Sequence, residues 1–158
     1  MIKLVRVDHR LLHGQIVFKW VRVLNINCIL IADDAVSKDT LRISALRMAK
    51  PDTCKLVIKS IDDSIQAIQS KAADRYNLLI ITSSIADAYR LAQGVPEIKK
   101  INLGGTKGQE GRHQISKAIF ISDEDEQMLR ELNKKGIRLE IQMVPDDIPE
   151  DIIKRIGS

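Results

Sequence analysis

With 158 residues, 44% of them hydrophobic and 29% charged, the chain has the size and composition of one globular domain with a packed core. Its net charge of +4 is spread along the sequence, and aromatic residues make up only 3%, which argues against nucleic acid as a partner. The charged start MIKLVRVDHR is unlike a signal peptide, and no apolar run approaches the roughly 20 residues of a membrane-spanning helix, so we expect a cytoplasmic protein without a membrane-inserted segment.

Short apolar runs rich in β-branched residues alternate with amphipathic runs along the chain. They predict strands and helices in the order strand 2–7, helix 14–24, strand 28–32, helix 37–49, strand 55–60, helix 61–72, strand 77–82, helix 84–93, strand 99–104, strand 117–122, helix 123–135 and strand 137–144. Ser37, and Ser122 or Asp123, occupy positions typical of helix N-caps. This alternation predicts an α/β fold, an open, mainly parallel twisted sheet of about seven strands with helices on both faces.

The longest irregular segment runs from Gly104 to Gln114. The strands on either side of it are too close for a helical crossover, so one strand there is expected to run antiparallel. Cys28 and Cys54 lie in separate apolar segments without metal-ligand spacing, and we expect both in the core. Because no linker, repeat or low-complexity tract interrupts the pattern, residues 1–158 are predicted to form a single domain.

The loop after the first strand holds the best candidate for a reactive side chain. Ligands of open parallel sheets bind beyond the carboxyl ends of the strands, and this strand ends near Asp8. A neutral imidazole is a competent nucleophile near pH 7, so His13 can carry a phosphoryl group. Gly14 removes a side chain that would block an approaching ligand, Arg10 is a forked donor for phosphate oxygens, and Asp8 can orient the imidazole or the guanidinium. Taken alone, the same pattern also fits a capping or packing histidine beside a surface ion pair.

Other strand ends contribute residues that could border this loop. His9 and Gln15 belong to the loop itself, as neighbours of the candidate acceptor. His113 follows a glycine-rich stretch and reads as a solvated loop residue. The residues expected at the rim of the site are Asp33, Ser83, Gly104, Gly105 and Lys107.

Residues 6–15, RVDHRLLHGQ, closely resemble the R-[IV]-D-x-R-L-[IL]-H-G-Q signature of one family of enzymes. These are the enzyme IIB subunits of the mannose/fructose/sorbose family of the bacterial phosphoenolpyruvate-dependent sugar phosphotransferase system. The similarity continues through ILIADDAVSKD (29–39), INLGG (101–105) and ISKAIFIS (115–122), so it covers nearly the full chain.

The resemblance implies a phosphocarrier. His13 would accept a phosphoryl group on Nδ1 from a phosphohistidine of enzyme IIA and pass it to a sugar held by the membrane subunits IIC and IID. Arg10 would bind the phosphoryl oxygens, and neither a cofactor nor a metal ion would be needed. The resemblance further implies a free-standing IIB without a fused IIA, associated peripherally with the membrane transporter. The identity of the sugar stays open, because specificity is expected in the membrane subunits.

Two other segments of the sequence suggest alternative functions. GGTKGQEG (104–111) could be a nucleotide phosphate loop of a small kinase, but it lacks the G-x-x-x-x-G-K-[ST] order and does not follow the first strand. Asp33 and Asp34 could bind a divalent cation in a receiver-like signalling module. The third predicted strand ends in Lys59 and Ser60, however, and offers no aspartate to phosphorylate.

Overall fold

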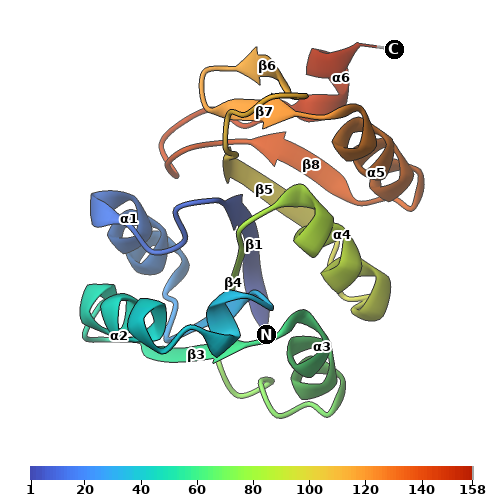
Figure 1. Ribbon diagram of the computed structural model, residues 1–158. Coiled ribbons are helices and arrows are strands. Elements are labelled where there is room, and N and C mark those ends of the chain that lie inside the picture. Colours follow the sequence, from blue (N-terminus) through green and yellow to red (C-terminus); the bar gives the residue numbers. More distant parts are fainter. Residues whose placement is uncertain (158) are drawn as a thin grey trace.

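The computed structural model describes residues 1–157, and its centre is a twisted seven-stranded sheet (Figure 1). The strands are β1 (Ile2–Asp8), β2 (Cys28–Ala32), β3 (Lys55–Lys59), β4 (Leu78–Thr82), β5 (Lys100–Gly105), β8 (Arg138–Ile141) and β9 (Glu150–Asp151). Their order across the sheet is β3-β2-β4-β1-β5-β8-β9. All neighbours are parallel except β8 and β9, which pair antiparallel. The predicted fold class is therefore confirmed.

The position of the antiparallel strand differs from the prediction. Residues 117–122 do not join the main sheet: β7 (Ile119–Ile121) pairs antiparallel with β6 (His113–Ser116) in a separate two-stranded sheet. The reason is that β5 already has β1 on one edge and β8 on the other, so it has no free edge for β7. The seventh strand of the main sheet is β9, whose two charged residues carry no alternating pattern that could have predicted it.

The helices lie close to their predicted positions. They are α1 (Gly14–Leu24), α2 (Thr40–Ala49), α3 (Ile61–Gln69), α4 (Ile85–Gly94), α5 (Asp123–Lys134) and the unpredicted α6 (Ile152–Ile156). Ser122 caps α5 in a capping box with Asp125, as expected. Ser37 is not a cap. It lies in a 3₁₀ turn, η1 (Val36–Lys38), and the side chain of Asp39 caps α2 instead. Within residues 1–157, no helix has the length and apolar character to cross a membrane.

Helices cover both faces of the sheet (Figure 1). Buried side chains of α1 and α2 pack on one face, and those of α3, α4, α5 and α6 pack on the other. Successive side chains of each strand point to opposite faces of the sheet and so reach both layers of helices. In β2, Ile29 and Ile31 face α1 and α2, whereas Leu30 faces the opposite layer. Cys28 and Cys54 are both buried free thiols, which confirms their predicted place in the core.

This topology singles out the carboxyl end of β1. From β1 the chain passes through α1 on one face towards β2, whereas from β4 it passes through α4 on the other face and returns to β5, on the far side of β1. Connections that leave in opposite directions open a crevice at the strand ends, where ligands of such folds bind. The loop that follows Asp8 therefore lies at the switch point of the sheet.

Candidate functional site

The loop between β1 and α1 is anchored by two leucines and bent by unusual backbone angles. Leu11 is 1% exposed and Leu12 6% exposed, so both side chains belong to the core beneath α1. Leu11 has φ of 60° and Gly14 has φ of 49°, both in the left-handed region. The buried leucines stabilise this geometry, and His13 takes the N-cap position of α1 with its side chain one-fifth exposed.

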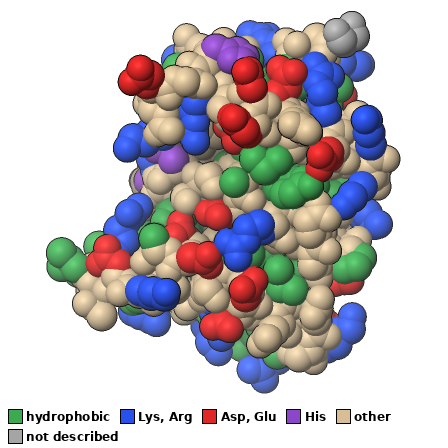
Figure 2. Space-filling model, turned by 45° about the vertical axis from the view of Figure 1, so that its right-hand side comes forward, with side chains coloured by type: hydrophobic (Ala, Val, Ile, Leu, Met, Phe, Trp, Pro, Cys, Tyr) green, Lys and Arg blue, Asp and Glu red, His purple; other side chains and the backbone are tan. Residues whose placement is uncertain are grey.

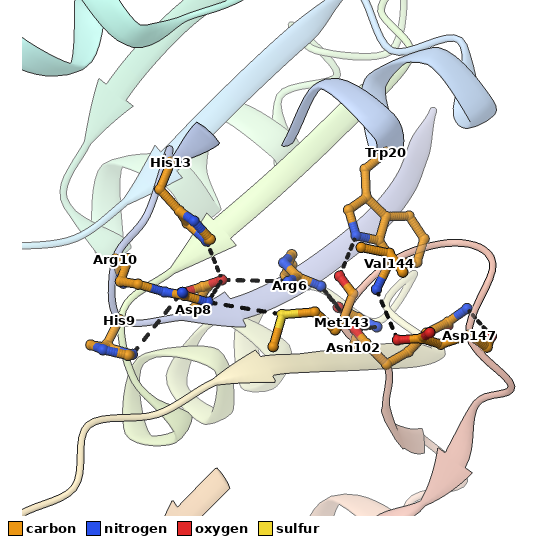
Figure 3. A network of polar contacts seen from close by, with 11 residues as sticks. Arg6, Asp8, His9, Arg10, His13, Trp20, Asn102, Met143, Val144 and Asp147 are labelled. Carbon is orange, nitrogen blue, oxygen red and sulfur yellow. Dashed lines mark hydrogen bonds and ion pairs between the residues drawn. The ribbon is translucent and has the colours of Figure 1, made fainter. Parts of the chain in front are cut away.

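A fully buried carboxylate lies at the centre of the loop (Figure 3). Oδ2 of Asp8 is 2.8 Å from Nε2 of His13. Oδ1 accepts hydrogen bonds from the backbone N–H of Arg10 at 3.1 Å and from its Nε at 3.2 Å. The sequence left open whether Asp8 contacts the imidazole or the guanidinium, and in the structure it contacts both. Since an ionised carboxylate only accepts hydrogen bonds, this contact requires a hydrogen on Nε2 of His13 when Asp8 is ionised.

A second arginine, Arg6, approaches Asp8 from inside the sheet. Its side chain is 2% exposed, and Nη2 lies 3.4 Å from Oδ2 of Asp8. Nη1 donates to the side chain of Asn102 and, at 3.0 Å, to the carbonyl of Gln142, while the guanidinium lies 5.6 Å from the centre of the Trp20 ring. Arg6 was not predicted as a site residue. The available signal was its charge in the middle of the apolar run IKLVRV, which a buried strand tolerates only with a partner.

The charges of this cluster are balanced by close contact. Burial alone would raise the pKa of the Asp8 carboxyl, but hydrogen bonds from His13 and Arg10 and the charge of Arg6 outweigh burial and hold that pKa below its ordinary value. Burial lowers the pKa of the Arg6 guanidinium, while the charge of Asp8 opposes this effect. An arginine nevertheless stays protonated in proteins, so Asp8 is a buried anion beside a buried cation.

The glycine turn at the end of β5 is packed against the same cluster. A Cβ atom at Gly104 would lie 2.2 Å from Cζ of Arg6, so only glycine leaves room for that guanidinium. At Gly105 a Cβ would lie 3.5 Å from Oδ1 of Asp8 and from Nη2 of Arg10, an ordinary contact. Both predicted rim glycines therefore lie beneath the loop, as its floor.

The side chains of the remaining loop residues, His9 and Gln15, make few contacts with this cluster. The backbone N–H of His9 donates to the carbonyl of Gly105 at 3.1 Å. Its side chain is about one-third exposed, and Nδ1 is 4.0 Å from Oδ1 of Asp8, with no hydrogen-bond partner among the described residues. Gln15 is exposed on the first turn of α1. Neither side chain contacts the ring of His13 by a hydrogen bond within residues 1–157.

The other predicted rim residues border an open pocket on the His9 side of the loop. Asp33, Ser83 and Lys107 line this pocket of about 500 Å³ together with His9. The hydroxyl of Ser83 donates to Asp33 at 2.7 Å, and at 3.4 Å it also meets Asp87, a residue that the sequence did not indicate. Burial and the nearby charge of Asp33 raise the pKa of Asp87. His13 is not among the lining residues, so the pocket adjoins the candidate site without containing this histidine.

The structure argues against both alternative functions, the nucleotide-binding kinase and the metal-dependent signalling module. The glycine-rich segment 104–111 runs from β5 to the β6–β7 hairpin, whereas a nucleotide phosphate loop leads from a strand into a helix. Asp34 accepts from the N–H of Ile61 at 2.9 Å and pairs with Arg90 at 2.8 Å, and Asp33 accepts from the N–H of Val36. Within residues 1–157 no group of three or more His, Cys, Asp or Glu side chains is placed to hold a metal ion.

Comparison with known proteins shows the family of this chain. The family described as "PTS system sorbose subfamily IIB component" matches residues 2–158. This chain belongs to that family. The sorbose-specific EIIB component of Lacticaseibacillus casei is 30% identical over 158 residues, covering 100% of this chain and 96% of the relative. The mannose-specific EIIAB component of Escherichia coli strain K12 is 27% identical over 147 residues, and the match covers 93% of this chain but 46% of that protein.

A solved structure supports the same assignment. The crystal structure of the IIBSor domain of the sorbose permease from Klebsiella pneumoniae matches with a TM-score of 0.94 and 29% identity, covering 99% of this chain and 96% of that one. The chain is accordingly a IIB component of a sugar-transporting phosphotransferase system. IIB components of this system are phosphotransferases.

Proposed function

We propose that this IIB component is a phosphocarrier whose acceptor is Nδ1 of His13. The observation that carries the proposal is the 2.8 Å contact between Nε2 of His13 and Oδ2 of Asp8. Because Nε2 donates its hydrogen to the carboxylate, the ring's free lone pair is on Nδ1. Nδ1 is therefore the nitrogen able to attack phosphorus, in agreement with the position expected from the family resemblance.

The proposed donor is a phosphohistidine of enzyme IIA. The Nδ1 lone pair attacks the phosphorus, the donor's N–P bond breaks, and its electron pair returns to the donor imidazole. His13 keeps the hydrogen on Nε2, so its ring becomes cationic, and the anionic Asp8 stabilises that charge as the carboxylate of a catalytic triad does. In the second step a sugar hydroxyl forms the new O–P bond, the N–P bond of His13 breaks, and the hydroxyl proton leaves to a base.

The charge on the transferred group needs further stabilisation, and the loop offers two sources. Arg10 is a forked donor whose side chain is 41% exposed, so it can turn from Asp8 to the phosphoryl oxygens. The start of α1 is the second source. Each of the other described α-helices has an N-cap side chain bonded to its first turn, whereas α1 has neither such a bond nor an acidic residue in that turn. Its first N–H groups and positive helix end thus suit a phosphate group.

The partners proposed for this relay are enzyme IIA as donor and the membrane subunits IIC and IID, which hold the sugar. One relative is named an EIIAB component, which fits a IIA partner for this chain. We propose that residues 1–158 act as one IIB domain in the cytoplasm, associated peripherally with the transporter. Gly14 and Gln15 would support the phosphoryl group, and the pocket bordered by Asp33, Ser83 and Lys107 would lie at the edge of the partner contact. The relatives bear different sugar names, so the sugar stays open.

The test is phosphoryl labelling of purified protein. Incubation with phosphoenolpyruvate, the general phosphotransferase proteins and a matching IIA should label the protein with an acid-labile, base-stable phosphate, whereas labelled ATP alone should not. His13→Ala should abolish labelling, and the matched variants His9→Ala and His113→Ala should retain it. Full labelling of a folded His13→Ala protein, or direct labelling by ATP, would overturn the proposal. Phosphorus NMR of the labelled protein identifies the nitrogen.

A further inference from the structure

Asp8 has two arginine partners that differ in mobility. Arg10 is at the surface, where it bonds to Asp8 and lies 3.9 Å from the sulfur of Met143. Arg6 is 1% exposed and is held on several sides, by Asp8, by Asn102, by a backbone carbonyl and by the face of the Trp20 ring. A side chain fixed in this way can neither turn to a phosphoryl group nor reach a partner protein (Figure 3).

The two arginines would separate their tasks during transfer. When Arg10 turns to the phosphoryl oxygens, Asp8 loses the Nε and Nη2 hydrogen bonds of that side chain. The remaining cation beside it is then Arg6, whose Nη2 is 3.4 Å away. Without Arg6, a fully buried carboxyl would lose the counter-charge that stays in place, and burial favours its protonated form.

A protonated Asp8 would change the chemistry of His13. A carboxylic acid can donate a hydrogen bond. The O–H of Asp8 would donate to the lone pair of Nε2, which is 2.8 Å away. The change takes up one proton from water: Asp8 holds the proton shared with Nε2, and the neutral ring carries its hydrogen on Nδ1, which blocks the nucleophilic nitrogen. The charge of Asp8 therefore determines which ring nitrogen can accept the phosphoryl group.

We propose that Arg6 is a positioning residue of this reaction, which acts through Asp8 to keep the hydrogen of His13 on Nε2 and the lone pair on Nδ1. The inference deepens the proposed function and rests on His13 as acceptor. Arg6 would touch neither the phosphoryl group nor the sugar. Its effect is to keep the buried carboxylate anionic and fixed while Arg10 moves.

A substitution at Gly104 offers a second way to displace the Arg6 guanidinium. A Cβ there would lie 2.2 Å from Cζ and from Nη2 of Arg6, both of them at the end of the side chain and not on the backbone. The φ angle of Gly104 is not in the left-handed region, so alanine meets no backbone strain at this position. Gly104→Ala should thus push the guanidinium away from Asp8 while the charges of the protein stay unchanged. At Gly108, by contrast, a Cβ would make only ordinary contacts of 3.5 Å with Phe120.

The experiment is nitrogen NMR of the His13 ring in unphosphorylated protein labelled with ¹⁵N-histidine, at a pH where the ring is neutral. The original chain should show the Nε2–H tautomer. Arg6→Met and Gly104→Ala should shift the tautomer ratio towards Nδ1–H by about tenfold or more, the scale of losing a charge-assisted hydrogen bond. Arg6→Lys, which keeps the charge, and Gly108→Ala, the matched glycine control, should retain Nε2–H. Circular dichroism establishes that each variant is folded, and Gly104→Ala serves if Arg6→Met does not fold.

Transfer kinetics provide the second measurement. Because Arg6 is buried away from any partner, Gly104→Ala should lower the rate at saturating phospho-IIA about tenfold or more and leave the half-saturating IIA concentration unchanged. An unaltered Nε2–H tautomer in folded Gly104→Ala would overturn the inference, and so would a predominant Nδ1–H tautomer in the original chain. Failure of the phosphocarrier function is seen separately, as continued labelling of His13→Ala.

Discussion

Asp8 is the residue on which the loop depends, because Arg6, Arg10 and His13 all bond to its carboxylate, which has no exposed surface. Its folded pKa lies below its ordinary value of 3.8. A group with a lowered folded pKa contributes stability above its unfolded pKa, and this contribution is lost as the pH falls through the folded pKa. The free energy of unfolding should therefore decrease as the pH is lowered from about 5 towards 2, partly through Asp8.

The corresponding variant is Asp8→Asn. At pH 7 it should lower the free energy of unfolding by about 3 to 5 kcal/mol, because it leaves Arg6 buried without its charged partner. Below pH 4 its stability should depend less steeply on pH than that of the original chain. Urea unfolding followed by the fluorescence of Trp20, the single tryptophan, measures both effects. Asp52→Asn, at an exposed turn, is the control, and an equal pH slope for the original chain and Asp8→Asn would contradict this role for Asp8.

Arg10 should matter for rate and little for the fold, since its side chain is 41% exposed. Arg10→Ala keeps the nucleophile but removes a charge-assisted donor worth roughly 1.5 to 4 kcal/mol to the transferred group. Phosphoryl transfer from phospho-IIA should slow by a factor of about ten to a thousand. Rapid-quench labelling measures the rate, with Arg138→Ala, an exposed arginine at the first residue of β8, as the matched variant. Equal rates for the two variants would show that Arg10 does not serve the phosphoryl group.

At the scale of the element, the junction between β1 and α1 depends on a glycine with φ of +49°. Gly136, in the turn between α5 and β8, has φ of +89°, and a Cβ at either glycine would meet nothing within 4 Å. Alanine at each position should therefore cost about 1 to 2 kcal/mol of stability through backbone strain alone. Only Gly14→Ala should also slow transfer, by about tenfold to a hundredfold, because it moves His13, the proposed acceptor.

Urea titrations and labelling rates of both alanine variants, measured side by side, separate stability from transfer. If Gly136→Ala slowed labelling as much as Gly14→Ala, the loss would reflect general destabilisation rather than the geometry of the loop. Ser122→Ala offers a further reference, since it removes the N-cap of α5 and should cost about 1 kcal/mol without any effect on transfer.

For the whole molecule, the surface charge sets how partners associate. Acidic and basic side chains are interspersed on the face seen in Figure 2, and the net charge is only +4. The basic residues that we expect near the IIA contact are Arg10, Lys19, Lys107 and Arg112. Arg112 already has partners within the protein, since it donates to the carbonyl of Lys107 at 2.8 Å and lies 3.7 Å from Asp125. Attraction to IIA is therefore expected to come mainly from the other three.

Affinity for unphosphorylated IIA should accordingly weaken as salt rises, by about tenfold between 50 and 500 mM, because screening shortens the range of exposed charges. Isothermal titration calorimetry measures the affinity. Lys107→Glu should reduce both the affinity and its salt dependence, whereas Lys3→Glu, at the opposite end of β1, should change neither. A salt-independent affinity would mean that Arg10, Lys19 and Lys107 do not attract IIA.

The amino-acid sequence by itself determined the fold class, most element positions and the candidate loop. Strands and helices have local periodicities that can be recognised in the sequence. Strands of a parallel sheet are buried on both faces, so they form continuous apolar runs such as CILIA and NLLIIT. RVDHRLLHGQ is equally local, so its histidine, arginine and glycine could be selected without a structure. The cysteines followed from their apolar surroundings in the same way.

Only the tertiary structure decided which groups meet. Residues 117–122 looked like a strand of the main sheet, yet both edges of β5 were already occupied, and no local pattern records such competition. Arg6 and Asn102 meet across 96 residues of sequence, and the clash that requires Gly104 exists only because Arg6 lies above it. The contact between Asp8 and Nε2 of His13, which leaves Nδ1 available, likewise depends on the left-handed turn at Leu11 and on buried leucines. Local sequence specifies periodicity and chemistry, whereas the pairing of distant side chains depends on how the strands are ordered and packed in space.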